Sequence, residues 1–365
     1  MSGALLRSAL IVGSARSSAW LSATWGWCLQ RRRTCTAWST PYLLPLAVPL
    51  LLFSADLRRV LRETGRLLGA FTWGAFATMA GSLLAFWLMP LRGLGADGWK
   101  VAAALTARHI GGSVNYVAVS EALALSPSAR MAGLAADDLI VSAYFLTLYA
   151  LARGVPPEQP STASLDEQAA GGAPAPAASA SPGTLQAVAE VLHGATALAL
   201  AAAICFAGTS IATALRYTGG SITVITAITV TLATLFPAVL APLRASGEGL
   251  AAILMQLFFA SVGASGSIVV VMKTAPTLFL WSAVSVSTHL GLVLAGERLW
   301  GFTRKESCLA SNANIGGPTT AAGMAAAKGW HSSLVPALLI GIMGYATATF
   351  IGVACATVFR HMQFA

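Results

Sequence analysis

Charged residues are scarce in this chain. Only 10% of its 365 residues are Asp, Glu, Lys or Arg, whereas 56% are hydrophobic. A soluble domain carries about 25% charged residues, so this sequence lacks the polar side chains that would cover a water-soluble surface. The composition therefore excludes a soluble globule. It predicts an all-α polytopic membrane protein with about 9–10 transmembrane segments.

Signatures of metal sites and catalytic sites are absent as well. The five cysteines are scattered and form neither a C-x-x-C pair nor a Cys/His spacing, so we predict no disulfide framework and no metal site. The chain has no H-E-x-x-H or G-x-S-x-G motif, so we predict that it is not an enzyme. No cofactor is predicted, and Na⁺ enters only as a candidate coupling ion.

Acidic residues are missing from the first 55 positions, which carry five arginines. Much of the net charge of +9 therefore lies near the N-terminus and in loops, which suits anionic membrane lipid or targeting machinery. No aromatic-basic pattern indicates a nucleic-acid partner. Residues 1–40 are rich in Ser, Thr, Ala and Arg, as in an organellar transit peptide. Because they also contain four tryptophans, an irregular N-terminus or the remnant of a first helix is an equal alternative.

The rest of the chain divides into two apolar halves. Residues 41–153 form the first predicted membrane repeat and residues 184–360 the second. Between them, residues 154–183 are rich in Pro, Ala, Ser and Gly and carry several acids. Such a segment cannot bury enough apolar surface to fold, so we predict a disordered linker.

A Gly-Gly pair interrupts one apolar segment in each half. Gly111-Gly112 lies in the first, and Gly316-Gly317 follows 205 positions later in the second. Glycine weakens a helix by about 1 kcal/mol relative to alanine, so each pair predicts a helix break. Two broken segments in corresponding halves of a membrane protein indicate the binding site of a secondary transporter.

Small polar side chains flank both breaks. A broken helix exposes half-helix ends, whose N-termini attract anions and whose C-termini attract cations. Neutral oxygen donors beside such ends suit Na⁺ or a polar organic solute. The alternative is that both segments are merely faces for close helix packing. The predicted substrate- or ion-binding residues beside the breaks are Ser113, Asn115, Asn312, Asn314, Thr319 and Thr320.

Asp137 and Asp138 are the sharpest ionisable feature. They lie about 9–10 Å into a helix predicted to begin at residue 131. A charged Asp near the bilayer centre costs about 2.5–3.5 kcal/mol, so it faces a cavity, is paired or is protonated. We predict that one member takes up H⁺ or Na⁺ to couple transport. The alternative is a pair close enough to the membrane surface to stay hydrated.

Arg108 and His109 immediately precede the first break. We expect both at the membrane surface, where the segment enters. In the alternative, Arg108 pairs with a helix-borne Asp or a substrate carboxylate, and His109 titrates near neutral pH. His289, a lone histidine in an apolar segment, is expected to be satisfied by packing.

The two halves show further similarity at the same offset of 205. Leu52-Phe53, for example, aligns with Leu257-Phe258, which predicts an internal repeat. An inverted repeat needs an odd number of crossings between these positions, but the apolar segments number about six. We therefore expect one segment within residues 184–241 not to cross, and a parallel repeat is the alternative.

Four stretches resemble a known family. They read YLLPLAVPLLLFSADLRR (42–59), HIGGSVNYVAVSEAL (109–123), GLAADDLIVSAYF (133–145) and SNANIGGPTTAAGMAAAKGW (311–330). They resemble the multi-pass membrane family called domain of unknown function 819, which occurs in bacteria and in plastid lineages. The family is grouped with cation:proton antiporters and anion transporters, including sodium/glutamate and sodium/bile-acid symporters.

This resemblance implies an inverted repeat with two crossed discontinuous helices and alternating access. Asn115, Asp137 and residues 312–320 would then line the crossing point. The family usually has Asp-Asn where this chain has Asp137-Asp138, and it has more helix ahead of Tyr42.

We therefore predict an ion-coupled transporter of a small anionic solute, embedded in membrane lipid as a candidate homodimer. Its predicted location is a chloroplast envelope or thylakoid membrane, with another cellular membrane as the alternative. The alternative function is a structural or assembly protein of the membrane.

Overall fold

The computed structural model describes residues 42–158, 184–216, 220–265 and 268–364. Every regular element in these ranges is a helix. The predicted transit peptide at residues 1–40 lies outside the described part, as does most of the predicted linker.

Six helices of the described part are long and apolar enough to cross a membrane, which confirms an all-α polytopic membrane protein. Two shorter apolar helices, Tyr42–Leu52 and α9 (Ser221–Leu235), accompany them. The long helices are fewer than the 9–10 segments predicted, because these two helices are short and two further segments are broken at their glycine pairs. The six are α3 (Arg66–Leu88), α6 (Pro127–Leu151), α8 (Thr184–Ala214), α11 (Arg244–Ser265), α12 (Ile268–Leu299) and α15 (Leu334–Phe364).

The first glycine-broken segment folds back on itself. It consists of α4 (Gly98–Gly111) and α5 (Ser113–Ala122). At the start of α4, Lys100 Nζ donates a hydrogen bond of 3.2 Å to the carbonyl of Ala124, just beyond α5. A straight helical path between these residues would be about 36 Å long. The segment is therefore a hairpin that returns to the end from which it entered.

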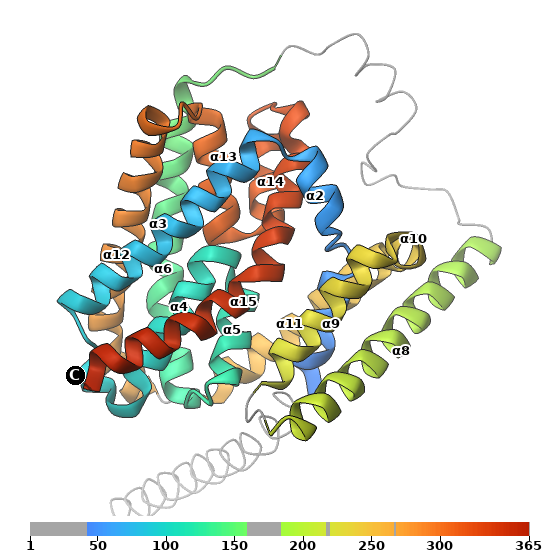
Figure 1. Ribbon diagram of the computed structural model, residues 1–365, viewed down its shortest axis with the longest axis horizontal. Coiled ribbons are helices and arrows are strands. Elements are labelled where there is room, and N and C mark those ends of the chain that lie inside the picture. The colour runs from blue at the N-terminus through green and yellow to red at the C-terminus, as the bar shows by residue number, and fades with distance from the viewer. Residues whose placement is uncertain (1–41, 159–183, 217–219, 266–267, 365) are drawn as a thin grey trace, which may run out of the picture.

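The second segment has the same shape. It consists of α13 (Arg304–Gly316) and α14 (Pro318–Ala327). Lys305 Nζ, at the start of α13, lies 3.5 Å from Ser332 Oγ, beyond α14. The crossed discontinuous helices implied by the family resemblance are thus replaced by two hairpins, which lie in the lower and upper halves of Figure 1.

The hairpins enter from opposite ends of the molecule. Helix α15 begins at Leu334, directly after the Ser332 end of the second hairpin. At its other end, Gln363 Oε1 accepts a hydrogen bond of 2.8 Å from the Trp99 amide in the first turn of α4. Since 31 residues of helix extend about 46 Å, the two open ends lie a full membrane thickness apart.

This geometry changes the count of crossings. The first glycine-broken segment was one of about six apolar segments expected to cross the membrane between the aligned positions. Because it returns to its own end, it is not one of these crossings, and within residues 184–241 the 15-residue α9 is also not among the six helices long enough to cross.

Local signals set the starts of the key helices. Ser126 caps α6 by accepting a hydrogen bond from the Ala129 amide, and Pro127 occupies the first turn, where no amide donor is needed. Thr303 and Glu306 form a reciprocal capping box at the start of α13.

Two groups of helices lie side by side (Figure 1). The hairpins pack among α3, α6, α12 and α15, a group that we call the core bundle. Beside it, α8 packs against α9 and α11, and we call these the flanking layer together with the helix Tyr42–Leu52. Helix α9 contacts α5 and α15, and α11 contacts α6.

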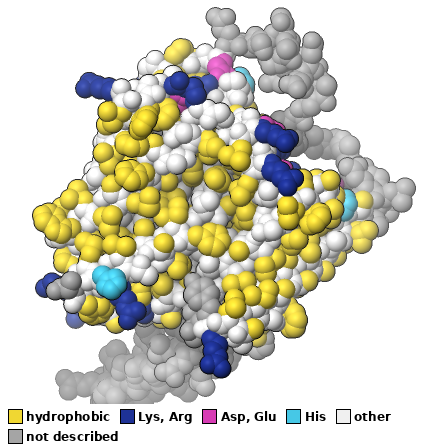
Figure 2. All heavy atoms as spheres, viewed as in Figure 1, with side chains coloured by type: hydrophobic (Ala, Val, Ile, Leu, Met, Phe, Trp, Pro, Cys, Tyr) yellow, Lys and Arg dark blue, Asp and Glu magenta, His cyan; other side chains and the backbone are white. Residues whose placement is uncertain are grey.

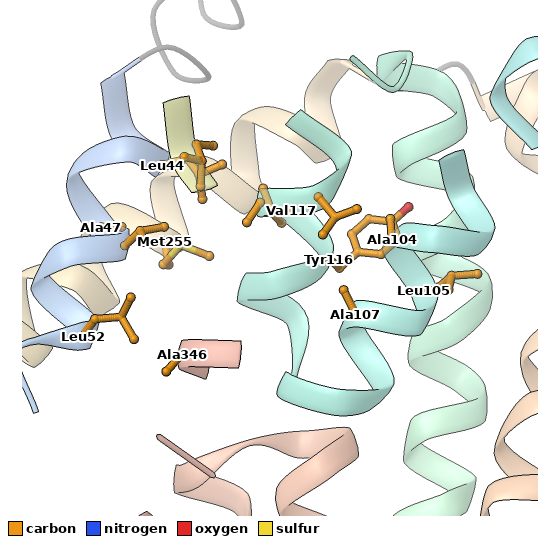
Figure 3. Close-up of a cluster of buried hydrophobic side chains, with 14 of the residues drawn as sticks. Leu44, Ala47, Leu52, Ala104, Leu105, Ala107, Tyr116, Val117, Met255 and Ala346 are labelled. Atoms are coloured by element: carbon orange, nitrogen blue, oxygen red, sulfur yellow. The ribbon is translucent and has the colours of Figure 1, made fainter. Parts of the chain in front are cut away.

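An apolar seam joins the two groups. Leu44, Ala47 and Met255 of the flanking layer and Tyr116 and Val117 of α5 belong to one buried cluster (Figure 3). On the face shown in Figure 2, Lys and Arg side chains lie along the upper and lower rims, and hydrophobic side chains cover the zone between. This distribution is the one expected for a protein that contacts lipid around its middle.

Candidate functional site at the hairpin tips

Each hairpin turns at a glycine whose backbone only glycine adopts without strain. Gly112, between α4 and α5, has φ 78° and ψ −179°. Gly317, between α13 and α14, has φ 93° and ψ −167°. A side chain at either position would be strained, so the second glycine of each pair makes the break.

The two tips meet. A Cβ atom built on Gly112 would lie only 3.2 Å from the carbonyl oxygen of Gly316. The ring of Tyr345, on α15, covers both turns: its atoms would lie 3.4 Å from a Cβ on Gly112 and 3.0 Å from one on Gly317. Gly111 and Gly316 are the last residues of α4 and α13, so each helix ends at its glycine pair.

Three of the predicted polar residues are accessible. Ser113 begins α5, and Thr319 and Thr320 lie in the first turn of α14; none of the three is buried. Their helix N-termini carry partial positive charge, because the first amide groups of a helix lack intrahelical partners. These hydroxyl groups therefore lie where an anionic or polar solute would be favoured.

The predicted asparagines are buried instead. Both polar atoms of the Asn115 side chain are hydrogen-bonded: Nδ2 donates to the Gly111 carbonyl at 2.6 Å, and Oδ1 accepts from Thr349 Oγ1 at 2.7 Å. This asparagine braces the first tip against α15. Because its side chain is only 2% exposed, it forms part of the frame of the tip.

Asn312 and Asn314 are buried but incompletely bonded. The Nδ2 atom of Asn314 makes long contacts of 3.4 and 3.5 Å to the carbonyls of Phe71 and Ile110. Neither Asn312 Oδ1 nor Asn314 Oδ1 has a hydrogen-bond partner among the described residues. An unpaired buried acceptor costs about 1–3 kcal/mol, so both oxygens favour a bound donor or cation.

A buried charged cluster lies just below the first tip. Arg108 Nε is 2.5 Å from Asp137 Oδ2, and a terminal nitrogen of Arg108 pairs with Asp138. His109 Nε2 is 2.8 Å from Asp137 Oδ1. The expectation that Arg108 and His109 lie at the membrane surface is wrong, since the two residues are only 5% and 0% exposed. Their place in the last turn of α4 favours positive charge, because the helix C-terminus is partly negative.

The two aspartates differ in access. The side chain of Asp137 is 0% exposed, whereas that of Asp138 is 66% exposed. Adjacent residues point about 100° apart on a helix, so only one can face inward. Phe145, seven residues beyond Asp138 on the same face of α6, touches the position of Gly316. The Asp138 side of α6 is therefore the side that borders the second tip.

The depth of Asp138 makes its exposure informative. Helix α6 begins at Pro127, earlier than predicted, so Asp138 lies about 16 Å along its axis, near the middle of a 30 Å hydrocarbon core. A charged Asp facing lipid there would cost about 2.5–3.5 kcal/mol. Its pairing with Arg108 offsets this cost and favours a polar surround.

A second polar network was missed from the sequence. His289, on α12, is 1% exposed, and its Nδ1 lies 3.1 Å from the carbonyl of Gly74. Because a carbonyl can only accept, Nδ1 carries the proton and Nε2 accepts from Ser311 Oγ at 2.9 Å. Ser311 in turn contacts Tyr144 Oη at 2.5 Å. The histidine is thus satisfied by hydrogen bonds with α3 and α13, and not by packing alone.

Neither His289 nor Tyr345 carries a recognisable sequence signal. Each is a single polar or aromatic side chain in an apolar helix, and its partners come from helices far away in the chain. In the described residues, no group of three or more His, Cys, Asp or Glu side chains is placed to hold a metal ion. The role of Na⁺ stays a prediction.

Comparison with known proteins shows the family to which the chain belongs. A family model described as "Protein of unknown function (DUF819)" matches residues 30–362. The chain belongs to the DUF819 family. An "Uncharacterized membrane protein YjcL" of Bacillus subtilis (strain 168) is 29% identical to this DUF819 chain over 326 residues, covering 87% of the chain and 81% of that protein. No solved structure matches the chain.

The matched region contains both hairpins and the charged cluster of this DUF819 protein. With its apolar helices and a membrane-protein relative, the chain is an integral membrane protein whose helices contact lipid.

Proposed function

We propose that this DUF819 protein is an ion-coupled secondary transporter of a small anionic solute, which binds beside the hairpin tips. The observation that carries the proposal is the meeting of two glycine turns, from opposite ends of the molecule, next to a buried charged cluster. Interrupted helices at membrane depth are tolerated where they are buried in protein or line a cavity, and in transporters they form the substrate site.

The chemistry of the tips supports an anionic solute. Both return helices, α5 and α14, begin at the tips, so two partly positive helix ends converge there. Ser113, Thr319 and Thr320 supply accessible hydroxyl groups at those ends. The guanidinium group of Arg108, which lies near the first tip, is a positive group on the same side.

The acid pair supports coupling to a cation. Asp137 is closed off by Arg108 and His109, so Asp138 is the member that H⁺ or Na⁺ would reach from outside. This assigns the coupling role to the residue that the family usually replaces by Asn.

The order of elements supports an inverted repeat with alternating access. In the first half α3, a hairpin and α6 follow one another, and in the second half α12, a hairpin and α15 do so. The hairpins enter from opposite ends, as inversion requires. Movement of the core bundle against the flanking layer, along their apolar seam, would expose the tips to either side.

The alternative function is a structural or assembly role. Glycines of α15 favour it: a Cβ on Gly344 would lie 2.9 Å from the Ile110 carbonyl, so small residues serve close packing here. The absence of enzymatic activity, the plastid location and a homodimer remain predictions from the sequence.

Transport in proteoliposomes separates the two functions. The purified protein is first screened by thermal shift against Na⁺, pH and a panel of carboxylates, since a ligand of the native state raises the melting temperature. Flux of the stabilising compound is then measured in wild type and in a Ser113→Ala, Thr319→Val double variant.

We expect the double variant to lose most of the flux while its melting temperature stays unchanged, because neither side chain is buried. Gly323→Ala on α14 is the matched control, since nothing lies within 4 Å of its added methyl group. A protein that shows neither ligand stabilisation nor flux would favour the structural role.

A further inference from the structure

Arg108 is shared unequally between two carboxylates. Asp137 has two partners, Arg108 Nε on Oδ2 and His109 Nε2 on Oδ1. Asp138 has one charged partner, a terminal nitrogen of the same Arg108. Asp137 would therefore keep its buried contacts if Asp138 moved away, whereas Asp138 depends on Arg108 alone.

The exposures show which partner can leave. The Arg108 side chain is 6% exposed and that of Asp137 is 0% exposed, but that of Asp138 is 66% exposed. The Asp138 carboxylate thus lies between the guanidinium group and the accessible side of α6. This is also the side that borders the second tip through Phe145.

We propose that Asp138 is a built-in anion that occupies the Arg108 site when the solute is absent. A monovalent cation, H⁺ or Na⁺, neutralises Asp138 and releases the terminal nitrogen of Arg108 for the anionic solute. The inference rests on the transport function proposed above and gives its coupling rule, which is that cation and anion bind together.

Charge balance requires this coupling. The empty site holds Arg108, Asp137 and Asp138. The cation adds one positive charge at Asp138 and the solute adds one negative charge at Arg108, so the two together leave the net charge of the site unchanged. Either ligand alone would leave an uncompensated charge near the middle of the membrane, which is costly. A carrier that moves only in its empty and fully loaded states is a symporter.

Other titratable groups around the cluster are already engaged. His109 and Asp137 bind each other, and Tyr116 of α5 donates its hydroxyl proton to the Arg130 carbonyl at 2.8 Å. His289 of α12 has partners on both ring nitrogens. Near the tip, the side chains of α13 include the neutral amides of Asn312 and Asn314, which do not titrate. Asp138 is therefore the acid of the cluster that is exposed.

Chemical labelling of Arg108 tests the exchange without a known substrate. Purified full-length protein is treated with phenylglyoxal, which modifies accessible guanidinium groups, and the modified peptides are quantified by mass spectrometry relative to the exposed Arg62. We expect Arg108 to be protected in wild type and to react about tenfold faster in Asp138→Asn and Asp138→Ala, because a charged hydrogen bond is lost. Ser142→Ala, on the same face of α6, should stay protected.

Three further arms complete the test. Raising Na⁺ at constant pH should speed the labelling of wild type if Na⁺ is the cation, and lowering the pH in Na⁺-free buffer should do so if H⁺ is. Succinate or inorganic phosphate should protect Arg108 in Asp138→Ala.

If Arg108 is labelled equally fast in wild type and in Asp138→Ala, the exchange of Asp138 for the solute is wrong. It is also wrong if neither Na⁺ nor pH changes the labelling of Arg108 in wild type. Failure of both anions to protect the variant would overturn the anion site. Because labelling requires no transport, a positive result without any flux would instead refute the transport function.

Discussion

The two hairpins share one backbone plan but carry different chemistry. In the first, Arg108 and His109 precede the glycine turn and bind the aspartates of α6. In the second, the corresponding end of α13 carries Asn312 and Asn314, whose carbonyl oxygens lack partners in the described part of the chain. The comparison assigns charge to one tip and neutral polar groups to the other, so we expect cation coupling to depend on the first hairpin.

The largest expected effect tests the charged tip. Arg108→Gln should leave Asp137 buried with His109 as its remaining charged partner, and removal of one member of a buried ion pair costs about 3–5 kcal/mol. We expect a large drop in melting temperature or failure to fold, measured by thermal melting of purified protein. Arg62→Gln is the control on an exposed arginine. A melting temperature like that of wild type would show that the buried cluster does not stabilise the first hairpin.

Alanine at the turns compares the two tips directly. Gly112→Ala and Gly317→Ala each place a side chain at positive φ, which costs about 1–3 kcal/mol. The cost should be greater at Gly317, because three atoms of Tyr345 would lie 3.0–3.3 Å from its Cβ, whereas the nearest atom to a Cβ on Gly112 is the Gly316 carbonyl oxygen at 3.2 Å. Chemical denaturation of the variants in detergent measures the difference. If both variants unfold at the same denaturant concentration as Gly323→Ala, the turns do not have the backbone described above.

The asparagines extend the comparison to hydrogen bonding. Asn115→Ala removes two short hydrogen bonds, worth about 1 kcal/mol each, whereas Asn312→Ala removes an amide whose oxygen has no partner. We therefore expect Asn115→Ala to destabilise more than Asn312→Ala. The reverse order would mean that the Asn312 oxygen is occupied by a ligand or an ordered water molecule in the purified protein.

The smallest effect concerns the open ends of the hairpins. The first is closed by Lys100, which binds the Ala124 carbonyl and Asp97, and the second by Glu158, which binds Lys305 and Ser332. Partial desolvation raises the pKa of Glu158, but hydrogen bonds from Lys305 and Ser332 outweigh it and lower the pKa from 4.5 to about 2.

A carboxyl group with a lowered folded-state pKa stabilises the protein above its unfolded value and loses that contribution as the pH falls. The contact should therefore weaken between pH 4.5 and about 2. Hydrogen exchange of α13 and α14 should rise over this window more than that of α4 and α5, and Glu158→Gln should remove the difference. Equal acid sensitivity of both hairpins would show that Glu158 does not close the second one.

Much of this architecture could be predicted from residues alone. Low charge and long apolar segments predicted the membrane helices, and the glycine pairs predicted where two of them are interrupted. The direction of the chain after each break could not be predicted, because a glycine at positive φ permits a turn without specifying its angle. The hairpins became evident only from contacts such as that of Lys100 with the Ala124 carbonyl.

The charged cluster shows the same division. Sequence spacing placed Asp137 and Asp138 on different faces of one helix but could not tell which face was buried, because both alternatives satisfy the same helical period. The surface position expected for Arg108 and His109 was wrong, since their partners lie on α6, about thirty positions away in the chain.

The amino-acid sequence alone was enough to establish a membrane-embedded helical protein with paired glycine interruptions, because hydropathy and helix propensity are local properties. Tertiary contacts were needed to decide that the interruptions are re-entrant, that their tips meet beneath Tyr345, and that Arg108 lies between a buried and an exposed aspartate. Those features depend on which helices pack together, and packing among similar apolar helices is encoded by shape and by a few polar partners far apart in the chain.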